Sequence, residues 1–147
     1  MTRAAFGGFS AVVPEGWKAG RDEVTYSEAG EHPPMRFRSP GRRGTLRVNV
    51  PWLDADEQPG ADPDELEALA REWGLRRGLD EPLACAAEVV GGLGRAAASY
   101  RLGEDFVEVW FVSDGSALIK ASYVCRWEDR EIDRAARTAL AGSLRPA

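Results

Sequence analysis

The side chains that most often carry out catalysis are sparse in this sequence. Its one histidine, His32, lies in the run Glu31-His32-Pro33-Pro34. Nucleophilic catalysis by serine or cysteine needs a base held beside the nucleophile, and this proline-rich loop offers no spacing that would hold one. We therefore interpret His32 as a loop residue and expect no catalytic residues of this kind.

Glu108 is the one carboxylate that stands among apolar residues on both sides. A carboxyl group buried in such surroundings has a raised pKa and could act as a general acid or base. A type I turn over residues 113–115 would pair Val112 with Ser116 and place Glu108 opposite Lys120, outside the core. This register favours a structural ion pair, whereas a slip of one residue would bring Glu108 into the core.

The same register sorts the two strands into an inner and an outer face. The outer face would include Trp110 and is too apolar to be fully wet, so we expect a helix or a partner to cover part of it. The inner face would form the core, with Val107, Val109, Phe111, Ala117, Ile119, Ala121, Tyr123 and Cys125.

Metal and phosphate motifs are incomplete. The segment 54–65 has acidic or amide groups at several ligand positions of a calcium hand, but Pro59 stands where that loop needs glycine. Cys85 and Cys125 are isolated cysteines, typical of buried free thiols. The glycine-rich run 91–94 precedes a strand pattern and so indicates a hairpin turn. We expect no metal and no cofactor.

Arginines gather on one predicted hairpin. Alternation places Arg36, Arg38 and Arg47 on one side of its strands, with Arg42 and Arg43 at the tip. A solvated strand face and a docking site for an acidic partner both account for this pattern. If it is a docking site, Trp52 and Trp110 are further candidates for the contact surface, because aromatic residues and arginine dominate interface energetics.

The surrounding patterns predict an α+β domain spanning residues 1–147. Strands are expected at 9–14, 22–27, 35–38 and 45–52, and a meander at 84–90, 95–102, 105–112 and 116–126. One helix is predicted over 62–77, with Asp62 as N-cap and an apolar stripe that includes Leu66 and Ala70. A second helix is predicted over 128–144. Its apolar stripe starts at Ile132, and Arg137 lies on its polar side. The result is an antiparallel sheet of about six to seven strands flanked by two helices.

Composition narrows the class of partner. The net charge of −5 argues against broad nucleic-acid binding. No stretch has the length of a signal peptide or a membrane span, so we expect a cytoplasmic protein that does not contact membranes.

The opening run Phe9-Ser10-Ala11-Val12-Val13-Pro14-Glu15-Gly16-Trp17, together with the order of the predicted elements, resembles the PsbP-like superfamily. The resemblance extends over most of the chain. It implies an antiparallel sheet flanked by helices, and it implies binding rather than catalysis, because members of this group act mostly as adaptors, chaperones or assembly factors.

These observations predict a non-catalytic protein-binding module, such as an adaptor, a secretion chaperone or an immunity-type protein. Its partner would be another protein, and self-association stays open. The alternative is a small-ligand or enzymatic pocket lined by Trp and Tyr side chains with Glu108 as acid or base.

Overall fold

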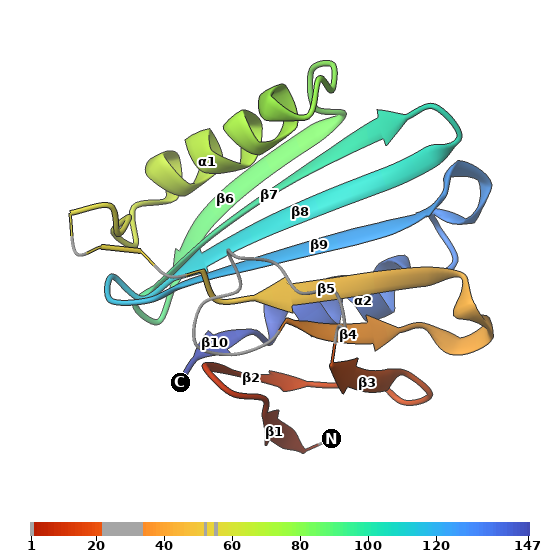
Figure 1. The fold of residues 1–147 in the computed structure, drawn as a ribbon, viewed down its shortest axis with the longest axis horizontal. Helices are drawn as coiled ribbons and strands as arrows, with labels where there is room; N and C mark the ends of the chain where they lie inside the picture. Colours follow the sequence, from red (N-terminus) through yellow and green to blue (C-terminus); the bar gives the residue numbers. More distant parts are fainter. Residues whose placement is uncertain (1, 22–33, 52, 55) are drawn as a thin grey trace.

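The computed structural model of the chain describes residues 2–21, 34–51, 53–54 and 56–147 (Figure 1). Its elements in chain order are β1 (Arg3–Ala5), β2 (Phe9–Val12), β3 (Lys18–Arg21), β4 (Met35–Arg38), the 3-10 turn η1 (Pro40–Arg42), β5 (Gly44–Asn49), α1 (Pro63–Arg76), β6 (Ala84–Val90), β7 (Leu93–Leu102), β8 (Asp105–Ser113), β9 (Leu118–Arg126), the 3-10 turn η2 (Trp127–Asp129), α2 (Arg134–Gly142) and β10 (Arg145–Pro146).

Seven antiparallel strands form the main sheet in the order β3-β4-β5-β9-β8-β7-β6. The predicted meander is confirmed as β6 to β9, and its first turn is a tight one at Gly91 and Gly92, which pairs Val90 with Leu93. A smaller sheet, β1-β2-β10, lies beside β3 and β4 (Figure 1). The α+β class and the strand number of the main sheet thus agree with the prediction.

Helix α1 covers one face of the sheet over β6, β7 and β8, which we call the α1 face (Figure 1). Asp62 caps the helix as predicted, accepting a hydrogen bond from the Asp64 N–H at 3.0 Å. Leu66 and Ala70 are fully buried on this face against Val109 of β8. The apolar stripe predicted from the sequence is therefore the contact surface of α1.

Helix α2 packs on the opposite face, the α2 face, and here the prediction was partly wrong. The segment predicted as one helix over 128–144 contains η2, a turn and then α2, which begins only at Arg134. Ile132 is 54 % exposed, whereas Arg137, predicted on the polar side, is 3 % exposed. Leu140 and Leu144 of the predicted stripe are buried as expected, but Ala139 is exposed and Ala141 is buried in its place. The buried stripe is therefore only partly the predicted one.

The register of β8 and β9 also differs from the prediction. Val112 pairs with Ile119 instead of Ser116, and Glu108 pairs with Tyr123 instead of Lys120. The cause is a longer loop, in which the Asp114 carboxylate accepts hydrogen bonds from the N–H groups of residues 116 and 117. An odd shift exchanges faces, so the predicted Glu108–Lys120 ion pair is wrong. The residues predicted to share one inner face lie on two faces of the sheet, although all of them except Ala117 are buried.

The corrected register explains why both faces of β8 are apolar. Val107, Val109 and Phe111 point to the α1 face, whereas Phe106 and Trp110 point to the α2 face. Each helix covers one of these sets.

The predictions for the remaining strands had different outcomes. The strands at 9–14, 35–38 and 45–52 correspond to β2, β4 and β5, whereas β1, β3 and β10 were not predicted. The weak strand predicted at 22–27 lies outside the described residues. No helix among the described residues is long and apolar enough to cross a membrane.

Candidate functional site

The half of the α1 face that α1 does not cover is cationic. Cross-strand pairing places Lys18 opposite Arg38, and Arg36 opposite Arg47, so these side chains share one face. On β3, β4, β5 and β9, every charged residue that points to the α1 face is basic; we call this set the cationic face, and its members are Lys18, Arg36, Arg38, Arg47, Lys120 and Arg126. In a chain of net charge −5, this face concentrates positive charge in one place.

The outer edge of the cationic face is hollowed into a groove of about 570 Å³. Its charged lining residues are Lys18, Arg36, Arg38 and Arg42, and no acidic residue among those that the structure describes lines it. Within the described part of the chain, no acidic side chain forms an ion pair with Arg36, Arg38 or Arg42. This groove therefore presents basic groups, without neutralising partners there, to whatever enters it.

Arg42 holds an unusual backbone conformation at the tip of the groove. Its φ is 56°, and it is the one non-glycine residue with positive φ among the described residues. This left-handed conformation costs an L-residue roughly 1–2 kcal/mol, which glycine avoids. Strained residues of this kind cluster at binding and catalytic sites, so Arg42 supports a functional role for the groove.

The cationic face continues toward α1. A second hollow of about 350 Å³ lies between α1 and the sheet, lined by Leu69, Glu72, Trp73, Arg76, Arg77, Phe111 and Lys120. The Arg77 guanidinium stacks over the Trp73 ring at 4.1 Å, and the Trp73 indole N–H is buried with no hydrogen-bond acceptor among the described residues. Basic and aromatic groups thus flank the cationic face on the side of the helix.

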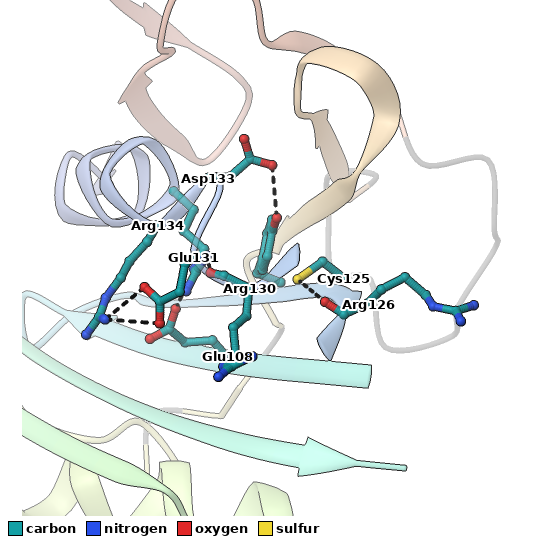
Figure 2. A network of polar contacts seen from close by, with 9 residues as sticks. Glu108, Cys125, Arg126, Arg130, Glu131, Asp133 and Arg134 are labelled. Carbon is teal, nitrogen blue, oxygen red and sulfur yellow. Dashed lines mark hydrogen bonds and ion pairs between the residues drawn. The ribbon is translucent and has the colours of Figure 1, made fainter. Parts of the chain in front are cut away.

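Glu108, the candidate acid or base, belongs to a structural network on the α2 face (Figure 2). The Arg137 Nε donates a hydrogen bond to its carboxylate at 3.0 Å, and the guanidinium lies 4.8 Å and 4.9 Å from the ring centroids of Phe106 and Tyr123. The Tyr123 hydroxyl in turn donates to Asp133 at 3.2 Å. The carboxylate of Glu108 therefore anchors α2 to the sheet, and it lines neither the groove at β3 and β4 nor the hollow beside α1.

Burial shapes the protonation of this network. Burial, followed by the nearby Cys125 and Asp133, raises the pKa of the Tyr123 phenol far above its ordinary value. Burial also raises the pKa of the Cys125 thiol. Both groups stay protonated near neutral pH, which suits a structural role. Cys85 and Cys125 are free thiols; Cys125 is buried as predicted, whereas Cys85 is only half-buried.

The acidic loop before α1 gathers Asp54, Asp56 and Glu57, whose carboxylate oxygens lie within 4.8 Å of one another. All three side chains are exposed. The element before the loop is strand β5, whereas a calcium hand needs a helix there. These residues form a solvated surface cluster to which we assign no metal.

The structure brings together only part of the predicted contact surface. Arg36, Arg38 and Arg47 share the cationic face, and Arg42 lines the groove beside them, with Arg43 exposed next to it. Trp110 points to the opposite face of the sheet, because it pairs with Ala121, which pairs with Val48. Trp52 and His32 lie outside the described residues.

Lys18 was missed by sequence reasoning, as was the buried role of Arg137. Strand β3, Lys18-Ala19-Gly20-Arg21, has neither alternating apolar residues nor β-branched ones, so nothing in it predicted a strand. The position of Lys18 could have been inferred only by pairing this segment with the predicted strand at 35–38. The burial of Arg137 could not be predicted for a similar reason, since its partner Glu108 lies far away in sequence.

Comparison with known proteins identifies the fold. No family model matches the sequence, and no curated protein does. The solution structure of cyanobacterial PsbP (CyanoP) from Synechocystis sp. PCC 6803 matches with a TM-score of 0.67 at 16 % identity, covering 99 % of this chain and 92 % of that one.

Two further solved structures match less closely. LpqN, involved in cell envelope biogenesis of Mycobacterium tuberculosis, has a TM-score of 0.52 at 12 % identity and covers 97 % of this chain and 88 % of its own. A protein from Bacteroides thetaiotaomicron VPI-5482 has a TM-score of 0.54 at 12 % identity over 98 % of this chain, which spans 47 % of that protein. At these identities the matches bear on architecture alone, and they agree with the predicted resemblance: the chain has a PsbP-like fold.

Proposed function

We propose that this chain is a non-catalytic protein-binding module whose cationic groove receives an acidic segment of a partner protein. The observation that carries the proposal is that every charged residue which the strands β3, β4, β5 and β9 direct to the α1 face is basic. A surface of one charge sign steers an oppositely charged partner and rejects others.

The shape of the groove favours an extended protein segment. Its lining comes from β3, β4, η1 and the turn before β3, and it includes Gly16, Gly20 and Gly41, whose lack of side chains leaves the backbone accessible. Arginine side chains can bind carboxylates through two parallel hydrogen bonds, which gives geometric selection as well as charge. The acidic balance of the whole chain makes a nucleic acid the weaker candidate, because phosphate binding usually accompanies a basic domain.

The direct test uses a defined probe. A fluorescein-labelled peptide of alternating glutamate and glycine is titrated with the protein at several salt concentrations, beside a glutamine version of the peptide. We expect the acidic peptide to bind, binding to weaken as salt rises, and NMR shift changes to concentrate on β3, β4 and η1. No binding of the acidic peptide, or equal binding of the glutamine version, would contradict the proposal.

Variants then locate the binding surface. Arg36→Gln/Arg38→Gln should weaken peptide binding at least tenfold, whereas Arg134→Gln, which removes an exposed arginine from α2, should not. Arg42→Gly should also weaken binding while leaving stability unchanged or higher by about 1 kcal/mol, because glycine adopts positive φ without strain. Equal weakening by Arg134→Gln would reject the groove, and tighter binding of a single-stranded oligonucleotide of equal charge would assign the surface to nucleic acid.

A further inference from the structure

A hollow of about 240 Å³ lies on the α2 face, between α2 and the strands β6, β7 and β8. Its floor is one cross-strand row, Ala86–Ala97–Trp110, in which two alanines leave space beside a large ring. The α2 wall is formed by Thr138, Ala141 and Gly142, which are also small. We call this hollow the alanine groove.

Arg95 lies in the neighbouring row, between Glu88 and Val112. Its Nε is buried and has no hydrogen-bond acceptor, and among the described residues none forms an ion pair with it. The guanidinium reaches α2, since a side chain at Gly142 would begin 3.7 Å from its Nη1. One donor of a permanently charged group, the Arg95 Nε–H, is therefore held beside the alanine groove without an acceptor among the described residues.

The charges around Arg95 are mixed. Its exposed cross-strand neighbour Glu88, which also lines the groove, favours the charged guanidinium, whereas Arg145 and Arg3 add positive charge nearby. Burial opposes the charged form of the guanidinium and lowers its pKa, yet arginine stays protonated in proteins. A bound carboxylate would supply the missing acceptor and compensate the buried charge.

We propose that the alanine groove binds a small carboxylate that carries an apolar tail. The carboxylate accepts hydrogen bonds from Arg95, and the tail lies over Ala86 and Ala97 against the Trp110 ring. Since a water-sized group occupies roughly 30 Å³, the groove has room for a tail of about six to eight carbons. This site lies on the face opposite the cationic groove and does not depend on the function proposed for that groove.

Two sources supply this chemistry: a free medium-chain carboxylate, and the C-terminal residue of a peptide with an apolar side chain. The exposed edge strand β6 runs beside the groove, so a peptide could also pair with its backbone. Titrations followed by NMR therefore use octanoate and the peptide acetyl-Gly-Gly-Leu, with octanol and the peptide's C-terminal amide as uncharged controls.

The expected result is that one carboxylate binds, shifts the Trp110 indole signal and binds at least tenfold more tightly than its uncharged control. Binding of octanoate with the β6 amides unchanged would identify a free carboxylate as the ligand. Binding of the peptide acid with slowed hydrogen exchange along β6 would identify a peptide C-terminus.

Variants separate this site from nonspecific binding. Arg95→Met keeps the apolar stem of the side chain but removes its charge, and Ala97→Leu fills the groove while leaving Arg95 in place. Each should weaken binding at least tenfold, whereas Arg101→Met, on the same face of β7, should change it less than twofold. The proposal would be overturned if neither carboxylate bound at millimolar concentration, or if neither Arg95→Met nor Ala97→Leu affected binding. If one of the two variants does not fold, the other variant decides alone.

Discussion

The two helices lie on opposite faces of one sheet and are held there by different chemistry. Helix α1 packs through Leu66 and Ala70, and the Tyr100 hydroxyl donates a neutral hydrogen bond to the Ala70 carbonyl at 2.8 Å. Helix α2 instead brings Arg137 into its contact surface and pairs it with Glu108. One interface is apolar, and the other contains an ion pair in which Arg137 is buried and Glu108 is half-buried, so the two should respond differently to substitution.

The largest expected effect comes from breaking the ion pair on one side. Arg137→Met leaves the Glu108 carboxylate without its partner and removes the cation between the Phe106 and Tyr123 rings. Because Arg137 is 3 % exposed, we expect a loss of about 3–5 kcal/mol in the free energy of unfolding, measured by urea denaturation.

Two comparisons sharpen this prediction. Arg134→Met removes an exposed arginine that pairs with Glu131 at 3.1 Å, and it should cost less than about 1 kcal/mol. Adding Glu108→Leu to Arg137→Met removes the orphaned carboxylate and should recover a large part of the stability. Equal losses in Arg137→Met and Arg134→Met would show that the buried pair does not hold α2.

The contrast between the helices also explains what the sequence could predict. For α1, the capping residue Asp62 and the stripe of Leu66 and Ala70 are local signals, and they gave the correct element and the correct buried face. The strands of the meander were found because tight turns at glycines separate alternating segments. Both kinds of signal lie within a few residues of one another in the chain.

The failures involve partners far apart in sequence. A buried Arg137 looks like a solvent-exposed residue until Glu108 is known to lie opposite it. The register of β8 and β9 depended on whether Asp114 closes a three-residue loop or a longer one, and Asp-Gly is compatible with both. The arginines of the cationic groove were predicted, but Lys18 was not. Lys18 lies there because β3 pairs with β4, and the sequence around it has no strand pattern.

A second prediction tests how closely α1 approaches the sheet. A Cβ added at Gly74 would lie 2.5 Å from the Tyr100 ring, so Gly74→Ala should destabilise the protein by about 1–3 kcal/mol despite the better helix propensity of alanine. Gly142 offers the matched control in α2, because its nearest neighbour would lie at 3.7 Å. Gly142→Ala should be neutral or slightly stabilising in the same denaturation experiment. If Gly74→Ala is instead as stable as the wild type, α1 can shift away from Tyr100.

The smallest expected effect at neutral pH concerns the buried phenol beneath α2. Tyr123→Phe removes its hydrogen bond to Asp133, which at 3.2 Å should contribute about 1 kcal/mol. A larger difference should emerge in alkali. Burial raises the pKa of Tyr123, so the folded chain keeps this proton while an unfolded tyrosine loses it near pH 10.

The unfolded state then binds fewer protons than the folded state, and stability falls as pH rises above about 10, by up to about 1.4 kcal/mol per pH unit for each such group. Tyr123→Phe should remove this contribution, so that its stability falls less steeply than that of the wild type in urea denaturation at pH 7, 9, 10 and 11. Tyr100→Phe should flatten the curve too, because burial also raises the pKa of Tyr100 under α1. An unchanged alkaline slope in both variants would show that neither helix keeps its phenol from water.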